Sequence, residues 1–177
     1  VFLVGNKASQ NTGKGNYETA ITKCQKAISL HSIKRRPVVN AGKQKNAKTK
    51  AYLQRKEYNP FLKNAWLMMG RAQFQKGDFL EAAATFSYIT RLYAAEPVVA
   101  NEARQWMARC YVLEKWYYDA DDALKRMRRD TMNTRTKHEA DATQAALLLG
   151  QERYAEAIPY LQRAEGFAKV LEKKSAL

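Results

Sequence analysis

The chain has 177 residues and a strong excess of positive charge, with 31 lysines and arginines against 17 acidic residues and a formal net charge of +14. It is long enough to bury a core without disulfides or metals, and no run approaches the roughly 18 apolar residues of a membrane-spanning helix. Only eight glycines and four prolines occur, which favours helices over a sheet with many turns, so we expect an all-α protein.

Residues 1–31 predict a first, partly degenerate helix pair. Its second helix, KGNYETAITKCQKAISL (14–30), has small and aromatic residues in a regular order, with Tyr17 and Ala20 as its clearest positions. The first helix would contain Gly5, Gly13 and Gly15, and glycine weakens a helix. We therefore expect this unit to be frayed or truncated at its start.

Residues 32–59 predict an insertion dominated by positive charge, which we call the basic insertion. Nine lysines and arginines accompany a single acid, Glu57, for a net charge of +8. Three interpretations are open: a solvated linker, a segment that docks on an acidic protein, or a contact for nucleic acid or anionic lipid. The candidate contact residues are Lys34, Arg35, Arg36, Lys43, Lys45, Lys48 and Lys50.

Residues 60–96 contain the clearest helix pair, within NAWLMMGRAQFQKGDFLEAAATF (64–86). Gly70 and Ala82 are small where two antiparallel helices would cross, and Lys76-Gly77-Asp78 would form the turn between them. Aromatic side chains would fill the space beside the crossing: Trp66, Phe74 and Phe86. The pattern therefore predicts a close helix hairpin.

The same spacing recurs along the chain. Units that begin at Lys63, Asn101 and His138 are offset by 38 and 37 residues, and each has an aromatic residue at position 17 and an alanine at position 20. We therefore expect a third unit over 97–132 and a fourth over 133–177. The fourth would end in an amphipathic capping helix, EGFAKVLEKKSAL (165–177).

This register resembles the tetratricopeptide repeat, a helix–turn–helix unit of about 34 residues. The resemblance implies an α-solenoid of antiparallel helix pairs, in which the first helix of each pair lines a concave groove. On this register the partner-binding groove is lined by Leu67, Met68, Arg71, Phe74, Gln105, Trp106 and Arg109. Such a groove would suit a peptide with acidic residues. The alternative is that these side chains pack on a neighbouring helix.

Residues that commonly carry catalysis or bind metals are sparse. His31 and His138 have no nucleophile at a motif spacing, and no HExxH, GxSxG or phosphate-binding glycine loop occurs. Cys24 and Cys110 lack CxxC spacing and are expected to be small buried apolar side chains. The sequence therefore predicts a protein that is not an enzyme and needs no metal or other cofactor.

Two further groups of residues have a structural explanation. Asp119, Asp121 and Asp122 lie near the start of an expected helix, where they compensate its dipole; a metal or partner site is the alternative. Trp66 and Trp116 fall at packing or turn positions and are expected in the core.

A closer resemblance is carried by AISLHSIKRRP (27–37), YNPFLKNAWLMMGRAQFQKGDFLEAAATFSYITRLY (58–93) and ANEARQWMARCYVLEKWYYDADDAL (100–124). These stretches are similar to the PorW/SprE-type tetratricopeptide lipoproteins of the Bacteroidota type IX secretion system. The resemblance implies a periplasmic, outer-membrane-associated scaffold of secretion and gliding motility that links the translocon to the motor-ring complex. Its membrane attachment would be a lipid anchor upstream of Val1.

The expected function is thus protein–protein interaction, with translocon or motor-ring components as partners. Nucleic acid is not favoured, because few aromatic residues accompany the basic run and no known nucleic-acid module is recognisable. The alternative is a general peptide- or nucleic-acid-binding basic repeat protein, which would be cytoplasmic.

Overall fold

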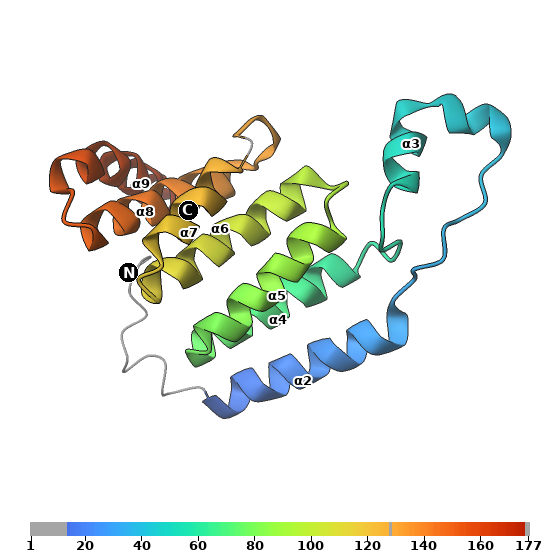
Figure 1. The fold of residues 1–177 in the computed structure, drawn as a ribbon, viewed down its shortest axis with the longest axis horizontal. Coiled ribbons are helices and arrows are strands. Elements are labelled where there is room, and N and C mark those ends of the chain that lie inside the picture. Colours follow the sequence, from blue (N-terminus) through green and yellow to red (C-terminus); the bar gives the residue numbers. More distant parts are fainter. Residues whose placement is uncertain (1–13, 128, 176–177) are drawn as a thin grey trace.

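Every regular element that the computed structural model describes is a helix, over residues 14–127 and 129–175 (Figure 1). The prediction of an all-α protein is therefore confirmed. The first helix expected within residues 1–13 lies outside the described residues, although Gly15 belongs to the following helix. The elements in chain order are α2 (Lys14–His31), η1 (Ala41–Lys45), α3 (Ala47–Leu53), α4 (Leu62–Lys76), α5 (Phe79–Leu92), α6 (Pro97–Leu113), α7 (Tyr117–Lys125), η2 (Arg129–Thr131), α8 (Thr134–Gly150) and α9 (Tyr154–Ser175).

The larger helices pack mainly on their neighbours in the chain. Helix α2 packs on α4, α4 on α5, α5 on α6, α6 on α7 and α8, and α8 on α9. Figure 1 shows α2, α4, α5 and α6 as a row of roughly aligned helices, with α8 and α9 at the far end of the row. Each inner helix of the row therefore buries apolar surface against the helices before and after it.

The turns that follow α4, α6 and α8 share one conformation. One or two residues beyond the end of each helix, the chain has a left-handed backbone: at Gly77 (φ 97°), Lys115 (φ 62°) and Glu152 (φ 60°). In the first turn the Asp78 N–H donates to the Gln73 carbonyl at 3.0 Å, and the Trp116–Tyr111 and Arg153–Leu148 bonds repeat this at 2.8 and 2.9 Å. These are Schellman turns, which reverse the chain in a fixed direction. They recur at the 38- and 37-residue offsets of the sequence units.

The main core lies between α4, α5 and α6. Phe86 and Ile89 of α5 are fully buried there, together with Ala103 and Cys110 of α6. A Cβ atom added to Gly70 would lie 2.7 Å from the Phe86 ring, a distance that real Cβ contacts essentially never reach. The expected small residue at this helix crossing is thus a requirement of the packing.

Both cysteines are buried and free, as expected. Cys24 packs with Ile21 between α2 and α4, and Cys110 belongs to the main core. Burial raises the pKa of the Cys110 thiol to about 12, so this thiol is protonated near neutral pH.

Two expectations about local structure are wrong. The stretch EGFAKVLEKKSAL does not begin a separate capping helix, because α9 runs without a break from Tyr154 and includes Pro159. Trp116 is not in the core: it is 48% exposed and stacks on Tyr111 with ring centroids 5.8 Å apart. Trp66, in contrast, is partly buried against two core clusters, as expected.

Candidate protein-binding surfaces

The residues predicted to line a groove come together where α4 meets α6. Trp106 of α6 lies between two guanidinium groups, with the Cζ atoms of Arg71 and Arg109 at 5.4 and 4.5 Å from the centroid of its ring. The Arg109 Cζ atom also lies 5.2 Å from the Phe74 ring centroid. These are cation–π contacts, and they hold both arginines against the helical body.

A small network of charges connects α4, α6 and α8 beside this stack. Arg71 forms a salt bridge with Glu102, and Arg135 pairs with Glu139 at 2.8 Å. Burial raises the pKa of the Glu102 carboxyl, against the opposing effect of Arg71, and burial lowers the pKa of the Arg109 guanidinium. The cost of removing these charges from water therefore offsets part of the attraction between them.

Most of the predicted groove residues are interior. Leu67, Phe74 and Trp106 are 5–6% exposed, and Gln105 is fully buried. The Gln105 Nε2 group donates to Thr143 Oγ1 of α8 at 3.2 Å, so this residue joins two helices. Met68, at 56% exposure, is the most accessible of the predicted groove residues. A partner contact at this surface stays a prediction. Met68 is accessible to a partner, whereas the four buried side chains are not.

Sequence reasoning missed the acidic members of this network. Glu139 lies four residues after Arg135, a spacing that brings two side chains together on one face of a helix, and this signal was available. The pairing of Glu102 with Arg71 depends on how α4 packs on α6 and has no local signal. The Asp121–Lys125 and Asp122–Arg126 pairs of α7 also follow the four-residue spacing, at 2.5 and 2.8 Å.

The basic insertion projects from the row of helices. Figure 1 shows it leaving α2, running outward to the compact region of α3, and returning to α4. Within the described residues, no carboxylate forms an ion pair with any of the seven candidate contact residues, and all seven are exposed: Lys34, Arg35, Arg36, Lys43, Lys45, Lys48 and Lys50. The insertion therefore presents positive charge that the rest of the described fold does not neutralise.

The base of the insertion is closed by one buried carboxylate. Glu57 accepts hydrogen bonds from Ser32 Oγ (2.6 Å), the Ile33 N–H (2.9 Å) and the Asn59 N–H (2.8 Å). The Tyr58 N–H donates to the Ile33 carbonyl at 2.9 Å. Burial opposes the charged form of Glu57, but the hydrogen bonds outweigh it and lower the pKa of the carboxyl. The two ends of the insertion are thus tied together.

A second contact fixes the base to the helical body. Arg55 pairs with Glu96, just before α6, at 3.2 Å, and its Cζ atom lies 5.3 Å from the Tyr52 ring centroid. Tyr52 in turn makes an edge-on contact with the buried Tyr58. Arg55 therefore has a structural role, unlike the seven exposed cations.

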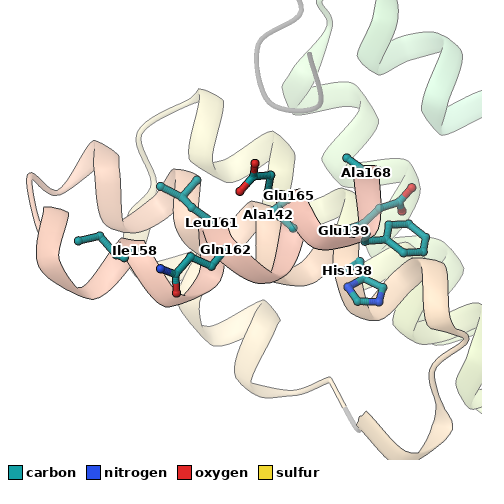
Figure 2. Close-up of a pocket in the computed structure, with 10 residues that line it drawn as sticks. His138, Glu139, Ala142, Ile158, Leu161, Gln162, Glu165 and Ala168 are labelled. Carbon is teal, nitrogen blue, oxygen red and sulfur yellow. The ribbon is translucent and has the colours of Figure 1, made fainter. Parts of the chain in front are cut away.

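An apolar cleft of about 460 Å³ lies between α8 and α9 (Figure 2). Ile158 and Leu161 of α9 line it and are 52% and 37% exposed. They occupy the repeat positions of Ala83 and Phe86 in α5, which are 4% and 0% exposed because α6 covers them. The repeat register could have predicted this exposed apolar surface, because it places large apolar residues at these two positions of the last unit, but sequence reasoning did not use it.

The part of the chain that the structure describes contains no group of three or more His, Cys, Asp or Glu side chains that could hold a metal ion. None of its helices has the length and apolar character needed to cross a membrane. In the comparisons with known proteins, no protein-family model, no curated protein and no solved structure matches this chain.

Proposed function

We propose that this protein is a non-enzymatic adaptor that binds other proteins, built as an α-solenoid of about four tetratricopeptide-like helix pairs. The observation that carries the proposal is the basic insertion, whose seven exposed cations have no acidic partner in the described residues while its base is tied by Glu57. An acidic protein surface would supply the missing negative charges.

Two features support the solenoid part of the proposal. The Schellman turn recurs at Gly77, Lys115 and Glu152 with the offsets of the sequence units. The close fit of Gly70 against Phe86 has the small-against-large pattern expected between paired helices. The exposed apolar cleft between α8 and α9 adds a second surface that a partner could cover.

The partners we propose follow from the resemblance of residues 27–124 to the PorW/SprE-type lipoproteins. On that basis the protein is a periplasmic, outer-membrane-associated component of a type IX secretion and gliding machinery, linking translocon and motor. An acidic face on a translocon or motor-ring protein would meet the basic insertion.

The test is an affinity capture from the native cell envelope at physiological salt. One variant replaces four cations of the insertion by glutamine: Lys43, Lys45, Lys48 and Lys50. The matched control makes the same charge change at four exposed positions outside the insertion: Lys23, Lys26, Lys125 and Arg153. We expect wild type and control to retain the same few proteins and the insertion variant to lose them. Equal retention by all three proteins would contradict the proposal.

A second candidate function, binding of nucleic acid or other polyanions, is favoured by the same exposed cations. It predicts that the logarithm of the binding constant falls steeply and linearly with the logarithm of the salt concentration. It also predicts similar affinities for different polyanions. A salt series with a short single-stranded RNA and with heparin separates the two candidates, because an adaptor would keep its protein partner at a salt concentration that releases both polyanions.

A further inference from the structure

A second cavity, of about 540 Å³, lies between α5, α6 and α7 and is unlike the apolar cleft. Its walls carry four cationic side chains, two carboxylates and three hydroxyl groups. The cations come from different elements: Lys56 from the end of the basic insertion, Arg91 from α5, Arg104 from α6, and Arg126 just after α7. Four positive charges therefore converge from distant parts of the sequence.

The charges in this cavity are not balanced by its own residues. Arg126 pairs with Asp122 at 2.8 Å. Arg104 donates to the Asn101 amide oxygen at 3.1 Å, and no carboxylate of the described residues pairs with it, with Arg91 or with Lys56. Three cations thus lack an acidic partner within the described part of the chain.

Arg104 is the most informative of these cations. It is half-buried, and burial lowers the pKa of its guanidinium, as does the nearby positive charge of Arg126. Arg71 of α4 is also half-buried, but it has Glu102 as its partner. A half-buried guanidinium beside a like charge is unfavourable unless an anion shares its site.

The remaining walls indicate what kind of anion would fit. A volume of about 540 Å³ is typical of small-molecule sites and exceeds the needs of a bare inorganic ion. Met107 and Tyr111 offer apolar surface for an organic part, and Ser87 adds a hydroxyl group. Asp119, which has no ion pair in the described residues, can accept a hydrogen bond from a ligand hydroxyl.

We propose that this cavity binds a small phosphomonoester with hydroxyl groups, of about the size of a sugar phosphate. The phosphate lies against Arg104 and Arg91, because guanidinium groups donate paired hydrogen bonds to phosphate oxygens. Lys56 adds a third positive charge at the edge, and Asp119 faces the hydroxyl groups. The site shares only Lys56 with the basic insertion and none of its seven candidate contact residues, so the proposal does not rest on protein binding.

The test is isothermal titration of the full chain with ribose 5-phosphate, with inorganic phosphate and ribose as comparison ligands. We expect saturable binding of ribose 5-phosphate, weaker binding of inorganic phosphate, and none of ribose. Arg104→Gln should weaken ribose 5-phosphate about tenfold to a hundredfold. Arg91→Gln, at an exposed position, should weaken it by a smaller factor and keeps the test valid if the first variant does not fold.

The matched control is Lys48→Gln, which removes one exposed positive charge at a residue that does not line the cavity. It should change the affinity for ribose 5-phosphate less than about twofold. Absence of saturable binding, or an equal loss in Lys48→Gln and Arg91→Gln, would overturn the proposal. So would binding of a short RNA that outcompetes ribose 5-phosphate and depends on Lys48 but not on Arg91, because the anion site would then be the basic insertion.

Discussion

The arginines around Trp106 in the helical body and the cations of the basic insertion are used in opposite ways. In the body, Arg71 and Arg109 stack on Trp106, and Arg71 also pairs with an acid. In the insertion, seven cations are exposed and have no acidic partner among the described residues. The cations around Trp106 therefore help to hold the helices together, whereas the insertion needs only its base to be fixed and leaves its charges available.

The largest expected contrast comes from deleting apolar side chains in both regions. Phe86→Ala removes a fully buried ring and should lower the free energy of unfolding by about 3–5 kcal/mol, or unfold the protein. Val38→Ala in the insertion, at a residue 98% exposed, should change it by less than about 0.5 kcal/mol. Urea unfolding followed by circular dichroism measures both. A similar loss in both variants would show that the insertion contributes to the core as much as α5 does.

A sharper contrast adds the same methyl group at two glycines. Gly70→Ala places a Cβ atom 2.7 Å from the Phe86 ring and should destabilise the protein by about 1–3 kcal/mol. Gly42→Ala, in η1 of the insertion, meets no atom within 4 Å and should be nearly neutral. Thermal unfolding of both variants is the measurement, and a neutral Gly70→Ala would show that the helix crossing is loose.

The base of the insertion should behave as a local unit. Glu57→Gln removes the carboxylate that accepts from Ser32 and from the Ile33 and Asn59 N–H groups, so these amides should exchange with solvent about tenfold faster or more. The global free energy of unfolding should change less. Glu114→Gln, at a half-buried acid of the body with no ion pair in the described residues, is the control and should leave both amides protected.

Acid should have the same local effect as this substitution. Because the pKa of Glu57 is lowered in the folded protein, its contribution is fully present above the ordinary carboxyl pKa of about 4.3. It is lost as the pH falls through the folded pKa. Hydrogen exchange of the Ile33 and Asn59 amides, corrected for intrinsic rates, should therefore show opening only below the ordinary pKa. Opening near pH 7 would contradict the role of Glu57.

The smallest expected effect is a gain within the body. Lys115 has a left-handed backbone at the position that Gly77 occupies one unit earlier. Lys115→Gly should therefore stabilise the protein by about 0.5–1 kcal/mol. Gln75→Gly, at an exposed position inside α4, should destabilise it by about the same amount. Chemical unfolding of the two variants should give changes of opposite sign.

Local patterns predicted the helix hairpins well, because Gly77 and the small-against-large pair of Gly70 and Phe86 act between neighbouring helices. The pattern failed where a distant helix decides the outcome. Gln105 is buried because α8 covers it, and Glu102 of α6 forms a salt bridge with Arg71 of α4. The continuity of α9 past Pro159 also had no sequence signal, since proline ordinarily ends or kinks a helix.

The cavity between α5, α6 and α7 was beyond sequence reasoning for the same reason. Lys56 and Arg126 are seventy positions apart in the chain and meet only through the packing of the helices. The seven exposed cations, in contrast, could be predicted from composition alone, because a segment with high net charge and few large apolar residues has little reason to be buried.

The hydrogen bond from the Tyr58 N–H to the Ile33 carbonyl means that the chain leaves and re-enters the helical body at nearly one point. We therefore expect the outer part of this segment, before the contacts of Tyr52 and Arg55, to tolerate another length or composition without moving α2 or α4. The entropy of closing such a loop grows only slowly with its length. One helical body of this kind can thus be given new recognition properties by a graft that keeps the base of the insertion.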